Sequence, residues 1–321
     1  MYLELYLEDN MDLEFHYHIT YLLAMGGGFN KDDAYKIAYS SQYIDDNQAN
    51  ILVKDDQNNI YKNIQTQSYL LLDKTSKEIY VPFHFVPKCT LSKSLRKDCI
   101  FNPMEVESNS QLARNSLKKA LKLRDPYQIG ISSHAFVDSW AHQNFTGYAE
   151  VYNNIGYSYM AKSIGHFDAL HYPDSVSLIW KDSRLKDEKI NNNVRFLEAA
   201  WYLLDIFSKA NKIKPNAEII KLIQDIFGTA TENYFWNNTF LMPKRIRQYN
   251  KISKELFSCA IPKYSSTEWF KKIVKHSIKG FYWKNQAYKE SEWYLFNEAA
   301  KRHRKFINYK IRCALGKGIG G

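Results

Sequence analysis

The segment GISSHAFVDSWAHQNFTGY, residues 130–148, decides how the rest of this chain is interpreted. It places His134, Asp138 and His142 four residues apart. Side chains at that spacing share one face of an α-helix and rise about 6 Å along its axis from one to the next. Two imidazoles and a carboxylate cost free energy if they are buried without partners. The segment therefore predicts either a polar seam in a helical core or part of a metal site.

The bulk composition is that of a folded globular protein. The chain has 321 residues, of which 45% are hydrophobic and 24% are charged, and it is long enough to bury a large core. The formal net charge is +10, which favours acidic partners such as phosphate esters, nucleic acid or an anionic membrane surface. A solvated basic surface would give the same charge. No feature of the sequence identifies a protein partner.

The sequence shows neither the pattern of a Sec signal peptide nor a C-x-x-C pair. No run of 18 or more apolar residues occurs, so no transmembrane segment is expected. The N-terminal segment MYLELYLEDNMDLEF lacks the pattern of a Sec signal peptide. We therefore expect a cytoplasmic protein, or one exported without a Sec signal. The four cysteines form no C-x-x-C pair, which argues against a cysteine zinc site, and a Cys89–Cys99 bridge stays open for an oxidising compartment.

Hydrophobic periodicity predicts a mostly α-helical chain. Residues 48–100 differ, because a turn-prone DDQNN between apolar pieces favours short strands and loops. We therefore predict an all-α fold class: a single, mostly helical domain over 1–321 with a small irregular or β insert around 48–100. The predicted helical segments are 16–25, 30–47, 109–124, 127–145, 192–210, 216–234, 242–256, 266–282 and 285–313.

The histidines are concentrated in the first half of the chain. Seven of the nine precede residue 172, and they occur in four short segments. A lone histidine on an apolar face is usually a hydrogen-bonded core residue, but four such segments favour a shared ligand. A divalent cation binds neutral imidazoles and carboxylates and so removes the cost of burying them. The segments are EFHYHITY with His16 and His18, VPFHFVP with His84, HAFVDSWAH with His134 and His142, and GHFDALHYPD with His166 and His171.

Two acidic residues at a predicted helix end support the metal hypothesis. Asp45 and Asp46 close the helix over 30–47, where the negative end of the helix dipole disfavours carboxylates. A role as a metal ligand, or as a base beside a metal, accounts for their position. A solvated helix end is the alternative.

Five segments, taken in order, resemble the zinc-dependent phospholipase C fold, which the single-strand-specific zinc nucleases share. Within that superfamily the chain is most similar to a bacterial family of unknown function. The resemblance covers residues 12–205, whereas 206–321 is helical and matches weakly. The segments are DLEFHYHITYLLA, AYKIAYSSQYIDDN, VPFHFVP, GISSHAFVDSWAHQNFTGY and IGHFDALHYPD.

The resemblance implies a cluster of three zinc ions and a ligand for each position. Asp138 would bridge two ions, and Asp45 or Asp46 would serve as a metal-binding acid and as the catalytic base. His142, His166 and a carboxylate would hold the remaining ion, with Asp174 preferred to Asp168 and His171. The other implied ligands are His16, with His18 as second choice, His84 and His134.

The chain departs from the superfamily pattern at three points. His142 follows Asp138 by four residues instead of six, and Leu170 occupies the position four after His166 where an acid is usual. The superfamily also uses a mature N-terminal amine as a ligand, whereas this chain has about ten residues before the matching region and no signal peptide. A site with two ions therefore stands beside the one with three.

The predicted activity is hydrolysis of a phosphate ester, above all phospholipase C-type cleavage of a diester by metal-activated water. Asp45 or Asp46 would bind or orient that water. A single-strand nuclease is the alternative, and a non-catalytic, metal-stabilised helical protein is the second. The sequence contains no G-x-S-x-G motif and no Gly-rich phosphate loop.

Aromatic and basic segments bear on the choice of substrate. The loops WAHQNFTGY, VYNNIGYSYM and ENYFWNNTF, with the basic C-terminal helix, could contact an anionic membrane. The same residues could stack bases and follow a nucleic-acid backbone. We favour the phospholipid over nucleic acid by a small margin.

Overall fold

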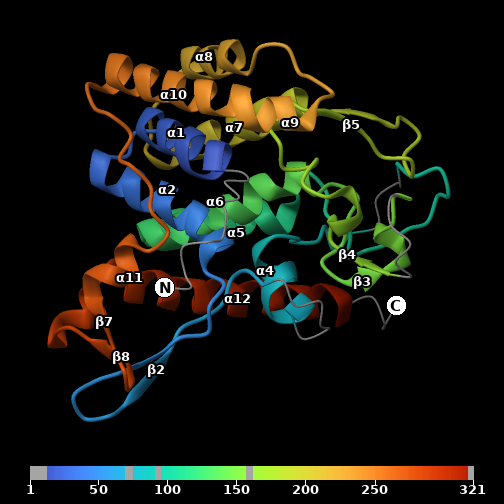
Figure 1. Cartoon of the computed structure of the whole chain (residues 1–321). Helices are drawn as coiled ribbons and strands as arrows, with labels where there is room; N and C mark the ends of the chain where they lie inside the picture. The colour runs from blue at the N-terminus through green and yellow to red at the C-terminus, as the bar shows by residue number, and fades with distance from the viewer. Residues whose placement is uncertain (1–12, 69–74, 91–94, 157–161, 317–321) are drawn as a thin grey trace.

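The opening segment forms the second half of a helix at the centre of the fold. The computed structural model describes residues 13–68, 75–90, 95–156 and 162–316. Helix α6, Pro126–Ala141, is buried from Tyr127 to Ala141, as expected for a helix that other elements surround on all sides. Asp125 caps it by accepting hydrogen bonds from two backbone N–H groups, and Pro126 occupies the first turn. In Figure 1, α6 lies between helices α1, α7 and α10 on one side and α12 on the other.

Helix α2, Lys31–Asp46, packs tightly against α6. Its N-terminus is capped by Asn30, whose side chain accepts a hydrogen bond from the Asp33 N–H at 2.9 Å. A Cβ atom on Gly130 would lie 2.3 Å from the carbonyl oxygen of Ile37 and 2.6 Å from Cβ of Ser40. Glycine is therefore required where the two helices meet. This close approach brings the C-terminal end of α2 beside the second half of α6.

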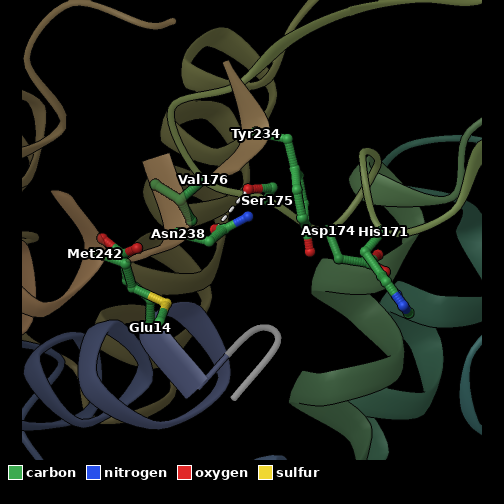
Figure 2. Close-up of a pocket in the computed structure, with 8 residues that line it drawn as sticks. All are labelled: Glu14, His171, Asp174, Ser175, Val176, Tyr234, Asn238 and Met242. Atoms are coloured by element: carbon green, nitrogen blue, oxygen red, sulfur yellow. Dashed lines mark hydrogen bonds between the residues drawn. The ribbon is translucent and has the colours of Figure 1, made fainter. Parts of the chain in front are cut away.

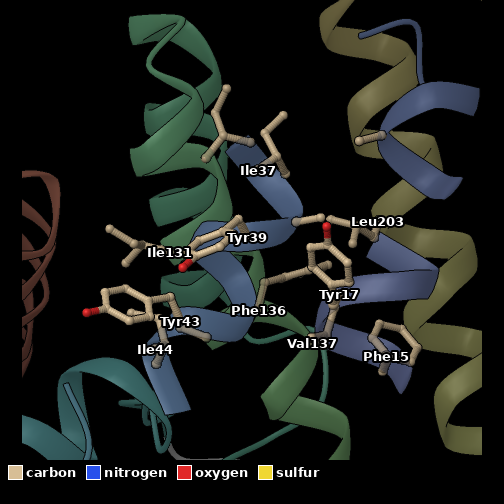
Figure 3. Packing of buried hydrophobic residues seen from close by; sticks show 14 of the residues in the cluster. Phe15, Tyr17, Ile37, Tyr39, Tyr43, Ile44, Ile131, Phe136, Val137 and Leu203 are labelled. Carbon is tan, nitrogen blue, oxygen red and sulfur yellow. The ribbon is translucent and has the colours of Figure 1, made fainter. Parts of the chain in front are cut away.

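The remaining helices pack around this pair. One hydrophobic cluster extends from Phe15 to Ile311, and Figure 3 shows Tyr17, Tyr39, Phe136 and Leu203 meeting inside it from four different helical segments. The longer helices are α1, Thr20–Gly26; α5, Gln111–Leu123; α7, Asn192–Ala210; α8, Ala217–Phe227; α10, Met242–Phe257; and α12, Glu292–Gly316. Short helical turns are η1, Leu13–Ile19; η2, Ser76–Tyr80; α4, Val81–Phe83; η3, Val151–Asn153; η4, Phe167–Ala169; α9, Tyr234–Trp236; η5, Asn237–Leu241; α11, Glu268–Ile273; and η6, Gln286–Glu290.

Small sheets lie at the edges of the helical body. The largest has the order β2-β1-β8-β7, in which β1 runs antiparallel to β2 and parallel to β8. Val53 of β1 is paired with Tyr61 on one side and Phe281 on the other. The protein is thus mostly α-helical with small β inserts, as predicted. The strands are β1, Leu52–Lys54; β2, Ile60–Lys62; β7, Val274–Ser277; β8, Gly280–Trp283; and the pairs β3, Ala149–Glu150, with β4, Ser163–Ile164, and β5, Ile179–Lys181, with β6, Lys189–Asn191.

Several predicted boundaries were wrong. The segment 266–282 is helical only as far as Ile273 and then forms the hairpin of β7 and β8, which pairs with β1. The segment 216–234 ends as a helix at Phe227, because Gly228 adopts a positive φ of 59°. The segment 127–145 leaves the helix at His142, and 285–313 begins as a separate short turn before α12. The 48–100 insert includes η2 and α4 beside its strands.

Two further expectations concern cysteines and membranes. Cys89 and Cys99 are free thiols, so the bridge between them does not form in this structure. No helix within the described ranges is long and apolar enough to cross a bilayer.

Candidate metal centre

Five side chains from four segments form a first group around α6. His134 and Asp138 lie on that helix, Asp45 is at the end of α2, His16 lies in the π-helical turn η1, and His84 caps the short helix α4. Their ligand atoms make two overlapping sets of three, each within 4.8 Å, which share His134. A buried π-helical turn is a frequent feature of functional sites. The first group could hold metal ions.

Asp138 is the centre of the first group. Its Oδ1 atom lies 3.1 Å from Nε2 of His16, and its Oδ2 atom lies 3.1 Å from Nε2 of His134 and 3.4 Å from Nδ1 of His84. Ligands at about 2.0–2.1 Å from a tetrahedral zinc ion are about 3.3 Å apart. Asp138 Oδ2 is buried without a hydrogen bond of good geometry. The ring nitrogens of His84 and His134 lie about as far from this oxygen as two ligands of one zinc ion lie from each other.

The ring of His84 is held in one tautomer. Its Nε2 donates to the carbonyl of Thr66 at 2.9 Å, so Nδ1 carries a lone pair. Thr66 is itself fixed to the end of α2, where its hydroxyl donates to the Ile44 carbonyl at 2.7 Å. The His84 lone pair faces Asp138 and lies 3.7 Å from Oδ1 of Asp45. Nε2 of His134 also lies within hydrogen-bonding distance of this lone pair, at 3.1 Å. A proton or a metal ion between these ring nitrogens and the two carboxylates would balance their charge, so this donor set fits a metal.

A second group, His142, His166 and Asp174, repeats this arrangement. Nδ1 of His142 donates to the carbonyl of His84 at 2.8 Å, and Nδ1 of His166 donates to the carbonyl of Leu170 at 2.7 Å. The two Nε2 atoms lie 3.0 and 3.1 Å from the two oxygens of Asp174. Both imidazoles therefore direct a lone pair at one carboxylate unless they are protonated. These three residues also lie within 4.8 Å of one another and could hold an ion.

Backbone strain positions His166. Leu170 has a φ of 51°, a left-handed conformation that costs a residue with a Cβ atom of order 1–3 kcal/mol. This conformation directs its carbonyl oxygen to the His166 ring. The two groups are joined through His84, whose ring belongs to the first and whose carbonyl holds His142 of the second.

Burial and the neighbouring charges shift the pKa values of these side chains in different directions. Burial lowers the pKa of His134 to about 3. Burial alone would lower the pKa of His142 as well, but the Asp138 and Asp174 carboxylates raise it to about 9. Burial opposes ionisation of Asp138, yet the neighbouring imidazoles hold its pKa well below the usual range. In the absence of metal, a proton on His142 therefore neutralises part of the negative charge.

The stability of the metal-free protein is expected to peak near pH 6.5. Burial lowers the pKa of His134 to about 3 and that of His303 to about 4, from 6.5. Their protonation therefore opposes folding as the pH falls below 6.5. His142 acts in the opposite sense: its contribution is complete below pH 6.5 and is lost as the pH rises through about 9. Urea denaturation in chelator, repeated across this pH range, measures both limbs.

The control for the alkaline limb is His142→Gln, which removes the group that titrates there. This variant in chelator should lose the decline above pH 6.5, and zinc-loaded wild type should lose it too, since a ligating imidazole is already neutral. A decline that persists unchanged in His142→Gln would contradict the assignment.

The structure separates several residues that the sequence left as alternatives. Asp46 lies outside both groups, and its carboxylate accepts a hydrogen bond from the Tyr264 hydroxyl. His18 is buried but belongs to neither group, and burial lowers its pKa to about 4. Asp168 accepts the backbone N–H groups of residues 155 and 156 at 2.7 and 3.0 Å, so its role is structural. His171 lines the pocket described below and is not in the second group.

Sequence analysis missed a buried ion pair that fixes η1. Nε and Nη2 of Arg245 donate to the two carboxylate oxygens of Glu14 at 2.7 and 2.9 Å, and the Tyr249 hydroxyl donates to the same carboxylate at 2.6 Å. Arg245 also donates to Asn237 at 2.9 Å. The signal in the sequence was Glu14, a carboxylate beside apolar residues just before the helix predicted over 16–25.

His303, which lies outside the four histidine segments, also has a positioning role. His303 of α12 is fully buried, and its Nε2 donates to the carbonyl of Pro82 at 2.8 Å. Its ring stacks on Phe83 with a centroid distance of 5.6 Å. The hydrogen bond holds the short turn that presents His84, so a helix near the C-terminus supports the first group. No pattern in the sequence pairs these two segments.

A pocket opens beside Asp174. Figure 2 shows Tyr234 and Asp174 on one side of it and Met242 and Glu14 on the other. The loop around Asp174 forms part of the wall, α9 and η5 form another part, and Glu14 of η1 and Met242 of α10 complete it. The lining residues are Glu14, His171, Asp174, Ser175, Val176, Tyr234, Asn238 and Met242.

The fold and the site together define a mostly helical protein with buried histidine–carboxylate groups that could hold metal ions. The chain belongs to the family described as "Family of unknown function (DUF6765)", whose profile matches residues 11–311. No curated protein and no solved structure matches the chain.

Proposed function

We propose that this protein is a zinc-dependent phosphoric ester hydrolase that cleaves a phosphodiester in the manner of a phospholipase C. The observation that carries the proposal is the convergence of all four histidine segments, with Asp45, Asp138 and Asp174, on two adjacent groups. The order of these residues along the chain supports membership of the phospholipase C and zinc nuclease superfamily.

Zinc suits the donors better than other common metals. The two groups offer imidazole nitrogens and carboxylate oxygens without a thiolate. His84, His142 and His166 each donate the N–H of their second ring nitrogen to a backbone carbonyl, and Nδ1 of His16 lies 3.5 Å from the Ser41 hydroxyl. His16 and Asp138 would hold one ion, Asp45 and His84 another, with Asp138 shared, and the second group a third. His134 belongs to both sets, but its single lone pair would ligate only one of the two ions. When bound, such ions lower the pKa of a coordinated water and neutralise the charge of a phosphoryl group.

Asp45 is the side chain placed to handle the water. Its side chain is 23% exposed, whereas those of His84, His134 and Asp138 are 5% exposed or less. Among the described residues, the Asp45 side is therefore where a substrate could approach the first group. There the carboxylate can orient a water molecule and accept its proton. This open side favours an enzyme over a protein whose ions only stabilise the fold, because structural sites are closed.

The test combines metal analysis with a panel of substrates. Protein purified without chelator should contain two or three zinc ions per chain, the number that the overlapping groups allow. It should hydrolyse bis-p-nitrophenyl phosphate and release diacylglycerol from phosphatidylcholine, and chelation should abolish both activities. Cleavage of single-stranded DNA alone would establish the nuclease alternative. Full metal loading with no activity on any substrate would establish a structural role.

A further inference from the structure

Three aromatic side chains form an exposed cluster beside the pocket. Phe235, Trp236 and Phe240 are 66%, 47% and 43% exposed. Their rings contact one another, with centroids 4.8 Å apart for Trp236 and Phe240 and 6.0 Å apart for Phe235 and Phe240. Single exposed apolar residues are ordinary, but a contiguous aromatic cluster usually marks an interaction surface.

The helical segment 234–242, which carries this cluster, lines the pocket with its opposite face. Tyr234, Asn238 and Met242, spaced four residues apart, line the pocket that contains Asp174 (Figure 2). Residues at this spacing share one face of a helix. The segment 234–242 therefore forms one wall of the pocket, and the aromatic cluster lies on the outer face of that wall.

A second exposed pair lies on the loop of the second group. Phe167 directly follows His166, and Leu170 lies three residues further on; their side chains are 51% and 54% exposed. A ring contact between Tyr172 and Tyr234, with centroids 5.4 Å apart, joins this loop to the segment 234–242. We call Phe167, Leu170, Phe235, Trp236 and Phe240 the aromatic rim.

Positive charge continues from the aromatic rim along α10. Lys244 and Arg247 follow Phe240 by four and seven residues, and both are exposed. Within the described ranges neither forms an ion pair, whereas the nearby Glu232 is paired with Lys189 at 3.2 Å. Exposed aromatic rings next to unpaired cations match the surface of an anionic bilayer, which accepts the rings among its headgroups and attracts the cations.

We propose that the aromatic rim docks this protein on an anionic lipid bilayer with the pocket at Asp174 facing the membrane. This orientation rests on the proposed function, but docking itself needs no metal. The exposure of the aromatic residues also shows which of the three aromatic segments named in the sequence analysis could contact a membrane. Trp140 and Phe145 of WAHQNFTGY are fully buried. In VYNNIGYSYM, Tyr152 and Ile155 are buried and Val151 is exposed, while residues 157–160 lie outside the described ranges.

The basic C-terminal helix is on the wrong side of the molecule for the same membrane. In Figure 1, α12 lies at the bottom of the view, and α9 and α10 lie at the top. A flat bilayer that contacts the aromatic rim therefore does not reach α12. The rim lies beside the pocket that contains Asp174 of the second group.

The test is flotation of the full chain with vesicles of phosphatidylcholine mixed with phosphatidylserine. The variant carries Phe235→Ser, Trp236→Ser and Phe240→Ser, and the control carries Leu52→Ser, Ile60→Ser and Ile278→Ser, which are exposed apolar residues of the four-stranded sheet and its hairpin. We expect the rim variant to bind at least about tenfold more weakly and the control to bind like wild type. A further pair, Lys244→Glu with Arg247→Glu, should weaken binding only when phosphatidylserine is present.

The outcomes separate docking from catalysis. Wild type that binds vesicles through the aromatic rim but hydrolyses nothing would support docking and overturn the proposed activity. Wild type that does not bind, or a rim variant that binds as well as wild type, would overturn docking. So would a wild-type dimer, measured by light scattering, that the rim substitutions convert to a monomer, since the rim would then join two copies of the chain.

Discussion

Replacing Asp138 by alanine is expected to remove zinc from the first group while zinc stays in the second. Both carboxylate oxygens of Asp138 face imidazoles of the first group at 3.1–3.4 Å. Its loss leaves His16, His84 and His134 without the shared anionic ligand. We expect the affinity of this group for zinc to fall by more than about 100-fold, beyond the loss seen when a supporting residue is changed. Competition with a chromophoric chelator and elemental analysis measure the change.

The matched control for this prediction is Asp168→Asn. Asp168 is also a buried carboxylate near the centre, but its oxygen accepts backbone N–H groups and lies outside both groups. An asparagine oxygen can still accept those hydrogen bonds, so zinc content should be unchanged. Thermal denaturation with and without zinc gives a second measure, because a ligand that binds only the folded state stabilises it. Equal zinc content in Asp138→Ala and wild type would reject the centre.

Asp45→Asn is expected to reduce kcat for phosphodiester hydrolysis by about 10²–10⁴-fold, the range for a lost general base. The carboxylate is the solvent-facing member of the first group and lies 3.6 Å from Nε2 of His134. Asparagine keeps the shape and an oxygen ligand but does not accept a proton. Zinc content should fall by less than one ion per chain, and KM should change little.

The neighbouring residue supplies the control. Asp46→Asn removes an adjacent charge on the same helix turn, but Asp46 accepts its hydrogen bond from Tyr264 and belongs to neither group. We expect its kcat to stay within about twofold of wild type, as for a change outside the reacting groups. An Asp46→Asn variant as impaired as Asp45→Asn would show that the effect comes from the helix end and not from one carboxylate.

Local patterns predicted the helices well wherever one face is buried and the ends are marked. The segment 192–210 is a helix with those bounds, and Asn30 caps α2 as its side-chain chemistry predicts. The segment 266–282 failed because the pairing of β8 with β1 overrides its amphipathic pattern. That pairing joins residues more than 200 positions apart, and periodicity carries no information at that distance.

The candidate site followed from the sequence only in part. His134 and Asp138 could be paired from their spacing on one helix, since a helix brings residues four apart together. His142 follows Asp138 by four residues, whereas the superfamily that the sequence resembles usually has six. The structure accounts for it: α6 ends at His142, and the ring turns away to Asp174 and to the carbonyl of His84.

The sequence by itself determined the helical class of the fold, the four histidine segments and the set of candidate ligands, because each depends on residues within a few turns of one another. Only the tertiary structure decided that Asp45 and not Asp46 faces the first group, and that Asp174 and not Asp168 meets His142 and His166. It also showed that His303 supports the turn of His84. These choices depend on how helices distant in sequence pack, as at Gly130, where the absence of one Cβ atom lets α2 approach α6.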